Sequence, residues 1–347
     1  MSEAATARML ISRARNRYKD IDADKTSGGK FYTTHAHWLT RPVIEFIESA
    51  LKMAPGFLDP FAGEGHLLTV CADRFQRPVA GFDLHAEQWT SQDSLRHIPS
   101  TPSILVTNPP YLAKHSASRK GVGASVAAYY AESGLDDLYQ VALLRCLAAA
   151  RFTVAIIPET FLNSSFPKEA LTAVSVLERN PFEDTENPVC VACFDAHTTT
   201  GETAARLFVE DQFCLSAGEL GALRRTVSRD SRIRFNDPLG TIALRAVDST
   251  DPKAPAGFLL GEGFVYDRQN IKISSRLLTY LSVPGLPTER RPALIAAANQ
   301  RLAELRSASH DLALSPFKGN NREGRRRRRL DYGLARRLLV EALEEIG

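Results

Sequence analysis

The chain has no uninterrupted apolar run close to the roughly 18–20 residues that a membrane-spanning helix needs. Its N-terminal segment is polar and rich in arginine, and it has no apolar stretch of the kind that a secretory signal carries. Both absences argue against a membrane protein or a secreted one. We therefore expect an intracellular, cytoplasmic protein that has no membrane partner.

Cysteine is scarce, with five residues among 347. An odd number in a chain of this length argues against a disulfide framework. Cys190 and Cys193 have the spacing of a metal-binding or redox pair, but they stand inside the apolar run Val189–Phe194. No second cysteine pair and no nearby histidine pair completes a zinc site. We interpret both as small core residues and expect no metal.

Charge is unevenly distributed along the chain. The composition, 44% hydrophobic and 24% charged, is ordinary for a globular protein, and the length suggests two domains. Residues 1–219 hold 20 Lys and Arg against 26 Asp and Glu, whereas residues 220–347 hold 23 against 14. The basic half is therefore the candidate for a surface that binds a polyanion.

Short apolar runs alternate with helical stretches between Phe57 and Val191. The runs predicted as strands are Gly56–Leu58, Val79–Phe82, Ile104–Val106 and Val154–Ile157, and the helices predicted between them include Gly65–Arg74 and Leu138–Ala150. This alternation predicts an α/β fold with a doubly wound, mostly parallel sheet. Beyond about residue 215 the alternation stops, so we expect domains at residues 1–215 and 216–347. In such sheets ligands bind at the carboxyl ends of the strands.

A glycine-rich turn follows the first predicted strand, in the segment Asp59-Pro60-Phe61-Ala62-Gly63-Glu64-Gly65. Glycine allows the backbone to approach a ligand closely, and the N-terminus of the following helix offers N–H groups to an anionic group. We expect that group to be the carboxylate of a methionine moiety rather than a phosphate. A single Gly-x-Gly is weak evidence for a nucleotide-like cofactor.

Two acidic residues follow at the next strand ends. Asp83 ends the run Val79–Asp83, where a carboxylate can bind two ribose hydroxyls. Asp93 lies ten residues later and is placed to accept the amino group of an adenine. Either residue alone would be interpreted as an ordinary surface carboxylate; the series of motifs favours a functional role.

The tetrapeptide Asn108-Pro109-Pro110-Tyr111 follows the buried run Ile104–Val106. Proline fixes φ and donates no N–H, so two in succession predict a rigid, extended corner. The Asn108 side-chain oxygen and the Pro109 carbonyl would accept both hydrogens of a planar amine. This pulls the nitrogen toward tetrahedral geometry, frees its lone pair and stabilises the positive charge that develops in the transition state. Tyr111 would stack on the target ring.

In the order of these motifs the chain resembles the gamma class of amino methyltransferases, which methylate adenine N6 in DNA. A Phe-x-Thr motif precedes the cofactor motif in that family, and Phe31-Tyr32-Thr33 stands there in this chain. Family members usually carry proline after the threonine, where this chain has Thr34-His35. The resemblance covers about residues 28–215. It implies S-adenosylmethionine as the cofactor, bound by Tyr32, Thr33, Asp59, Pro60, Phe61, Gly63, Gly65, Asp83, Asp93 and Asn108.

By the same resemblance, an aromatic side chain stacks on a base that is flipped out of the DNA helix. Phe182, in Pro181-Phe182-Glu183-Asp184, is our candidate, and core packing is the alternative. The family's strand followed by proline matches Val154–Pro158. The catalytic residues that we predict are Asn108, Pro109, Pro110, Tyr111 and Phe182.

Double-stranded DNA is the expected partner, bound by a target-recognition domain in residues 216–347. A small, polar and basic loop at Lys114–Gly123 is a second candidate for substrate contact, and a solvated loop is the alternative. Five consecutive arginines cannot share one helix face, so we expect them to follow phosphates rather than read bases. The candidate DNA-binding residues are Lys114, Arg119, Lys120, Arg224, Arg225, Lys318, Asn320, Asn321, Arg325, Arg326, Arg327, Arg328 and Arg329.

Other substrates are compatible with the tetrapeptide. Asn-Pro-Pro-Tyr also serves enzymes that methylate glutamine amides in proteins, or adenine and guanine amines in RNA. A non-catalytic DNA-binding protein with a vestigial methyltransferase fold is a further alternative. The Phe31–Thr33 motif and the basic C-terminal half favour DNA. The resemblance also suggests a bacterial, archaeal or phage origin and a restriction-modification or epigenetic system, with a cognate restriction endonuclease as a candidate partner.

Overall fold

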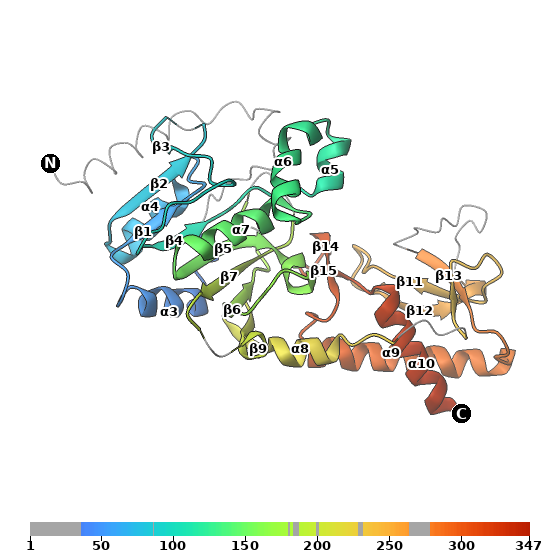
Figure 1. Ribbon diagram of the computed structural model, residues 1–347. Coiled ribbons are helices and arrows are strands. Elements are labelled where there is room, and N and C mark those ends of the chain that lie inside the picture. Colours follow the sequence, from blue (N-terminus) through green and yellow to red (C-terminus); the bar gives the residue numbers. More distant parts are fainter. Residues whose placement is uncertain are drawn as a thin grey trace. The chain divides into compact units, whose positions relative to one another are not determined.

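The computed structural model describes residues 36–85, 87–179, 181–182, 187–198, 201–227, 232–263 and 278–347. The chain divides into two compact units between Phe213 and Cys214 (Figure 1). The predicted motif Phe31-Tyr32-Thr33 lies outside the described residues.

A nine-stranded sheet forms the centre of the N-terminal unit, in the order β3-β2-β1-β4-β5-β7-β6-β8-β9. Its strands are β1 (Phe57–Asp59), β2 (Val79–Asp83), β3 (Thr90–Ser91), β4 (Ile104–Thr107), β5 (Phe152–Pro158), β6 (Leu171–Val176), β7 (Val189–Asp195), β8 (Arg206–Val209) and β9 (Gln212–Ser216). The pairs β1–β2, β2–β3, β1–β4 and β4–β5 are parallel, whereas β7 is antiparallel to both β5 and β6. The predicted α/β class and the mostly parallel sheet are confirmed.

The strand register brings three chain segments to one edge of the sheet. Phe57 of β1 pairs with Val79 of β2 and with Ile104 of β4. Because these strands are parallel, their carboxyl ends lie at the same edge. The motifs that follow β1, β2 and β4 are therefore neighbours, although up to 50 residues separate them in the sequence.

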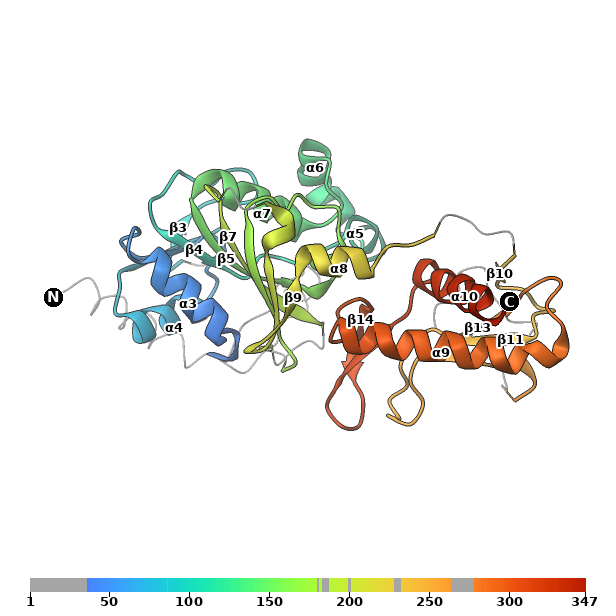
Figure 2. The ribbon, with the colours of Figure 1, turned by 90° about the horizontal axis from the view of Figure 1, so that it is seen from below.

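Helices cover both faces of the sheet. Figure 2 shows α3 (Arg41–Ala50) and α4 (His66–Phe75) on one side and α7 (Leu138–Ala149) on the other. Helix α3 has Pro42 in its first turn, where proline is favoured, and buries Val43, Ile47 and Ala50 at helical spacing. The described part of this unit also contains the short 3-10 helices η1 (Ala36–Trp38), η2 (Glu159–Asn163) and η3 (Glu202–Ala204).

The segment Lys114–Gly123 differs from the expected loop. Residues Lys114–Arg119 form helix α5, and α6 (Gly123–Ser133) begins directly afterwards. No glycine or proline interrupts residues 114–120, so nothing in this stretch prevents a helix. The Lys114, Arg119 and Lys120 side chains are exposed on it.

The core contains the cysteine pair that has metal-ligand spacing. Cys190 and Cys193 are buried on β7, as predicted, and are 0% and 1% exposed. Residues three apart on a strand face opposite sides of a sheet, so the two thiols cannot bind one metal ion together. Within the described residues, no group of three His, Cys, Asp or Glu side chains is placed to hold a metal. In the same residues, no helix is both long and apolar enough to span a bilayer.

The C-terminal unit has an antiparallel architecture. Its four-stranded sheet has the order β10-β13-β11-β12, formed by β10 (Arg234–Phe235), β11 (Ile242–Arg245), β12 (Gly257–Leu260) and β13 (Leu278–Ser282). A separate hairpin consists of β14 (Ser315–Asn320) and β15 (Arg326–Arg329). The helices are α8 (Ala217–Leu223), α9 (Arg291–Ala308) and α10 (Tyr332–Ile346), with the 3-10 helices η4 (Gly261–Gly263) and η6 (Thr288–Arg290).

Two of these helices begin with a side-chain cap that the sequence encodes. Ser216 and Glu219 form a reciprocal capping box at the start of α8. The Asp331 side chain accepts a hydrogen bond from the Leu334 backbone N–H at the start of α10.

Candidate active site

The turn after β1 contains a buried carboxyl group. Asp59 is 2% exposed, and its Oδ1 accepts a hydrogen bond from the Phe61 N–H at 2.9 Å. Burial raises the pKa of Asp59 from 3.8 to about 7, against the lowering effect of that backbone hydrogen bond. The predicted residues Pro60 and Phe61 follow directly, one buried and one partly exposed. The carboxyl group therefore changes charge near neutral pH.

The glycine turn is tied to the end of β2 through Asp83. The Gly63 N–H donates to Asp83 Oδ2 at 2.9 Å, and the His85 N–H donates to Oδ1 at 2.8 Å. Gly65 has φ +81°, a conformation that favours glycine, and is the N-cap residue of α4. Glycine has no side chain, so Gly65 provides no side-chain cap for the first-turn N–H groups of α4. The turn thus places a helix N-terminus beside a carboxylate.

Trp89 completes this turn, and the sequence motifs did not identify it. Its indole Nε1 donates to the Gly63 carbonyl at 2.8 Å. A Cβ atom on Gly65 would lie 2.6 Å from Trp89 Cζ2, and one on Gly81 would lie 2.7 Å from Cδ2. Only glycine at both positions leaves room for the indole. A tryptophan shortly after two spaced glycines is the signal that was available.

Replacing Gly65 with alanine should destabilise the fold by more than the strain of placing alanine at a positive φ. Gly134→Ala is the matched control, since Gly134 has φ +70° but would place its Cβ in open space. The control is expected to cost about 1–2 kcal/mol. Gly65→Ala must also displace Trp89, so its midpoint in urea unfolding should fall further. Equal losses in the two variants would show that Trp89 does not constrain the turn.

Asp93 is engaged by two side chains. The Tyr129 hydroxyl of α6 donates to Asp93 Oδ2 at 2.9 Å, and Arg96 Nε lies 3.2 Å from the same oxygen. The Arg96 guanidinium also lies over the Tyr129 ring, 5.6 Å from its centroid. Burial and the hydrogen bond to Asp93 raise the pKa of Tyr129. Asp93 therefore anchors α6, and an adenine amino group would have to share its carboxylate.

The predicted corner follows the end of β4. Asn108 and Pro110 are partly exposed there, Pro109 is buried, and Tyr111 is 9% exposed. The Tyr111 hydroxyl lies 2.6 Å from Asn108 Oδ1 and 2.7 Å from the Ile156 carbonyl oxygen of β5. Burial raises the pKa of Tyr111 well above its ordinary value. The corner is thus fixed to the neighbouring strand by the last residue of its own motif.

Three aromatic rings meet at this corner. The Tyr111 ring makes edge contacts with Tyr139 and Phe182, with centroids 6.5 and 6.2 Å away. Phe182 is 5% exposed and Tyr139 is 3% exposed. Phe182 and Tyr111 are thus brought together although 71 residues of sequence separate them. In this conformation both rings pack against other aromatic rings, so stacking on a base would require the cluster to open.

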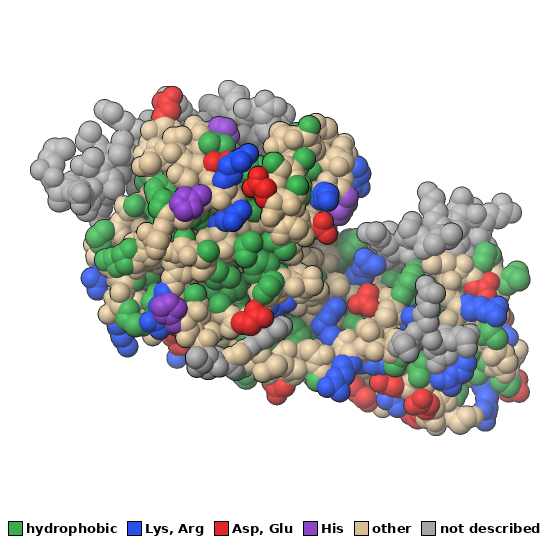
Figure 3. Space-filling model, viewed as in Figure 1, with side chains coloured by type: hydrophobic (Ala, Val, Ile, Leu, Met, Phe, Trp, Pro, Cys, Tyr) green, Lys and Arg blue, Asp and Glu red, His purple; other side chains and the backbone are tan. Residues whose placement is uncertain are grey.

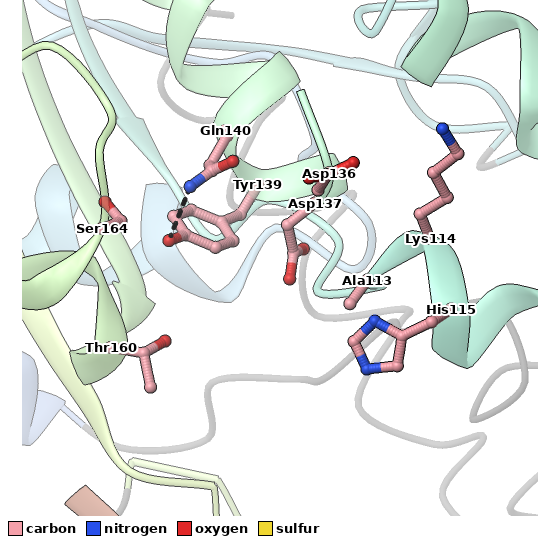
Figure 4. Close-up of a pocket in the computed structure, with 9 residues that line it drawn as sticks. All are labelled: Ala113, Lys114, His115, Asp136, Asp137, Tyr139, Gln140, Thr160 and Ser164. Carbon is pink, nitrogen blue, oxygen red and sulfur yellow. Dashed lines mark hydrogen bonds between the residues drawn. The ribbon is translucent and has the colours of Figure 1, made fainter. Parts of the chain in front are cut away.

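A pocket of about 620 Å³ lies next to this aromatic cluster. Figure 4 shows the Asp137 carboxylate pointing into it, with His115 and Thr160 across the space and the Lys114 ammonium turned away. Asp137 Oδ1 accepts a hydrogen bond from the Leu112 N–H at 3.2 Å, and burial raises its pKa to about 6. The lining residues are Ala113, Lys114, His115, Asp136, Asp137, Tyr139, Gln140, Thr160 and Ser164.

Four of the five consecutive arginines form strand β15, where residues alternate between buried and partly exposed. Arg326 and Arg328 are 8% and 4% exposed, so neither belongs to a surface that binds phosphates. Both were among the candidate DNA-binding residues, and their burial corrects that expectation for these two positions. A period of two places every second arginine inward. Arg327 lies over the Phe317 ring, 4.9 Å from its centroid, and Arg329 is partly exposed.

The two asparagines beside this run build the hairpin turn. Asn321 Oδ1 accepts hydrogen bonds from the N–H groups of Glu323 and Arg325, and Asn320 Nδ2 donates to the Gly324 carbonyl. Such local bonds are typical of asparagine in turns. The exposed cationic side chains of this hairpin are Lys318, Arg322 and Arg325, and the exposed Glu323 carboxylate lies 3.9 Å from Arg325.

Arg224 also has a structural role. Its guanidinium donates to the Ala313 carbonyl and pairs with Asp331 at 3.7 Å, while Arg225 is exposed. On the face drawn in Figure 3, Lys and Arg side chains are interspersed with Asp and Glu rather than gathered in one patch.

No family model matches the chain, and no curated protein matches it. Among solved structures it is similar to a putative class I S-adenosylmethionine-dependent methyltransferase from Listeria monocytogenes, with TM-score 0.40, 10% identity, and coverage of 60% of this chain and 72% of that one. It is similar also to a modification subunit of a putative type I restriction enzyme from Vibrio vulnificus, with TM-score 0.38, 13% identity, and coverage of 56% and 50%.

A third similar structure is the type I restriction-modification methyltransferase subunit from Streptococcus thermophilus, with TM-score 0.36, 15% identity, and coverage of 56% and 52%. The chain thus spans about half the length of the two restriction-system subunits.

Proposed function

We propose that this chain is an S-adenosylmethionine-dependent methyltransferase that methylates N6 of a flipped-out adenine in DNA. The observation that carries the proposal is the position of Asn108-Pro109-Pro110-Tyr111 at the carboxyl end of β4, beside the glycine turn after β1. Methyl donor and methyl acceptor would therefore meet at one edge of the sheet.

The residues at this edge fit the proposed cofactor. The α4 N-terminus suits a carboxylate, and the Asp83 carboxylate at the end of β2 suits ribose hydroxyls. The buried Asp59 carboxylate, ionised above pH 7, suits a cation. Gly63 and Gly65 allow the backbone to approach closely. When bound, S-adenosylmethionine supplies an electrophilic methyl group on a sulfonium ion. Tyr32 and Thr33 remain part of the proposal through the resemblance alone.

Asn108 and Pro109 would act on the amine. Their two oxygens accept the amine hydrogens, so the nitrogen lone pair points toward the incoming methyl group. The amine nitrogen would take the methyl group that S-adenosylmethionine supplies, leaving a neutral thioether, and the cationic amine would then lose its proton to water. Tyr111 and Phe182 would contact the base after the aromatic cluster opens. The adjoining pocket, which is large enough for a nucleotide, would receive the rest of the flipped-out residue.

A labelling experiment tests this function. The protein is incubated with S-adenosylmethionine carrying a labelled methyl group and with duplex DNA, RNA or protein extract. The expected product is labelled N6-methyladenine in DNA. Label found only in RNA or only in protein would refute DNA adenine as the substrate, and binding of the cofactor without transfer would support a vestigial site.

DNA binding is proposed to involve the exposed hairpin tip, with Arg119, Lys120 and Arg225 as further candidates. Replacing Lys318, Arg322 and Arg325 with glutamine should weaken binding to all sequences. It should also reduce the slope of log K against log salt by about 0.9 for each phosphate that is no longer neutralised. The control is the same change at Lys52, Arg74 and Arg77, which are exposed on the N-terminal unit. An equal effect of both triple variants would exclude the hairpin tip as a specific DNA-binding element.

The proposal includes a restriction-modification or epigenetic role, with a cognate restriction endonuclease as a candidate partner. Co-purification of an endonuclease with the tagged protein from its native cells would support this role. Methylation at sites that no native nuclease cleaves would favour an epigenetic one.

A further inference from the structure

The Tyr111 hydroxyl has more acceptors around it than it can serve. It lies 2.6 Å from Asn108 Oδ1 and 2.7 Å from the Ile156 carbonyl oxygen. Burial raises the pKa of Tyr111, so the hydroxyl keeps its hydrogen, but it has only one. If that hydrogen points to Asn108, two oxygen lone pairs face each other at 2.7 Å on the Ile156 side.

β5 pairs with β7 on its other side, but the Ile156 carbonyl oxygen lies 2.7 Å from the Tyr111 hydroxyl and so faces the β4 side. It needs this hydrogen because β4 has ended there. Residue Thr107 of β4 pairs with Ala155 of β5, and the ladder stops there. The next residues along the chain after β4 include Pro109 and Pro110, which have no N–H to donate. Ile156 is fully buried, and buried carbonyl groups are almost always hydrogen-bonded.

The orientation of an asparagine amide is judged from its hydrogen bonds, since its oxygen only accepts and its nitrogen only donates. If the Asn108 amide is turned over, its nitrogen faces Tyr111. The amide then donates to the tyrosine oxygen, and the hydroxyl donates to Ile156. The 2.6 Å separation is slightly below the usual range of about 2.7–3.2 Å for such a bond. A small displacement corrects that, whereas no displacement provides the missing hydrogen in the other arrangement.

We propose that Tyr111 is a positioning residue for Asn108: its hydroxyl donates to the Ile156 carbonyl and accepts from the Asn108 amide nitrogen, which turns the Asn108 oxygen toward the substrate amine. This rests on the proposed function, because the oxygen matters only if an amine binds there. The two prolines contribute twice. They shape the corner, and their missing N–H groups leave Ile156 to hold the tyrosine that orients the asparagine.

Neutron diffraction from deuterated crystals of the whole chain tests the arrangement without any substrate. The expected result is a deuterated Asn108 nitrogen facing the Tyr111 oxygen, with the hydroxyl deuterium directed at Ile156. The Asn108 oxygen facing the hydroxyl deuterium would overturn the inference. Because this measurement does not depend on activity, the inference can hold even if DNA is not the substrate, and it can fail even if DNA is methylated.

A kinetic experiment tests the consequence. Tyr111→Phe keeps the ring and should lower kcat about tenfold, with a much smaller change in KM, since it removes one orienting hydrogen bond. Tyr130→Phe is the control, because the Tyr130 hydroxyl is also buried and donates to a backbone carbonyl, that of Leu112. It should cost stability but leave kcat within about twofold. Equal losses of kcat in both variants would indicate a merely structural role.

The Asn108→Asp background separates orientation from stacking. The two oxygens of the carboxylate at position 108 are equivalent. In that background the Tyr111 hydroxyl therefore cannot determine which atom faces the substrate amine. Adding Tyr111→Phe should then lower the remaining kcat less than about twofold. A tenfold loss in this background as well would contradict the positioning role.

Discussion

Replacing Asn108 with alanine is expected to lower kcat by about 10²–10³-fold, the usual cost of removing one preorganised polar group from a transition state. The side-chain oxygen is one of two acceptors that would hold the amine, and the other, the Pro109 carbonyl, belongs to the backbone and stays in place. The amine would remain conjugated with its ring and a poor nucleophile. Single-turnover kinetics on methylatable DNA, with saturating cofactor, measures this step.

Cofactor affinity is the control for this substitution. The glycine turn follows β1 and is held by Asp83 and Trp89, whereas Asn108 follows β4. The cofactor Kd from calorimetry should therefore change little. Asn108→Asp retains an acceptor and should keep more activity than Asn108→Ala. Near-native kcat in the alanine variant would contradict the acceptor role, whereas a large rise in Kd would place Asn108 mainly in the cofactor site.

The strands and the motif edge were predictable because their signals are local. The runs at Val79–Phe82, Ile104–Val106 and Val154–Ile157 all form strands, within a few residues of the expected ends. An apolar run bounded by turn residues specifies a buried strand in its own sequence. Parallel order then brings the ends of β1, β2 and β4 together without further information.

The partners of the motif residues were not predictable, because they come from distant segments. Nothing near Asp93 indicates that Tyr129, 36 residues later, would donate to it. Asp137 and Tyr139 likewise join the site through the fold and not through a motif. The sequence shows the positive charge of the arginine run but did not allow the strand to be predicted. Arg326 and Arg328 are buried because side chains of a strand alternate between its two faces. Five identical residues show no such alternation in the sequence.

Asp59→Asn should make the protein more stable at alkaline pH and weaken its binding of the cofactor. Burial raises the pKa of Asp59 to about 7, so the folded chain holds this proton more tightly than the unfolded chain does. The Asp59 carboxyl group therefore contributes most to the free energy of unfolding at low pH, and this contribution is lost as pH rises from about 4 to 7. A shift of about three units corresponds to about 4 kcal/mol above pH 7.

Asparagine removes the charge but adds a buried donor, which costs about 1–3 kcal/mol if it finds no acceptor. The expected net gain at pH 8 is therefore about 1–3 kcal/mol, and it should shrink at pH 5. Urea unfolding at both pH values measures it. Asp195→Asn is the control of opposite sign. Burial alone would raise the pKa of Asp195, but hydrogen bonds from Arg151 and His197 hold it below its usual value. That variant should lose stability at pH 8.

The buried Asp59 carboxyl group destabilises the fold, and we expect it to serve the binding of the cationic cofactor. An ionised, poorly solvated carboxylate attracts a cationic ligand more strongly than a solvated one does. We therefore expect the cofactor Kd to rise in Asp59→Asn at pH 8, and to rise in the unmodified protein as pH falls below 7. A variant that is more stable and binds the cofactor unchanged would show that the charge of Asp59 has no part in binding. A variant that is less stable at pH 8 would show that burial of the ionised group is not a cost.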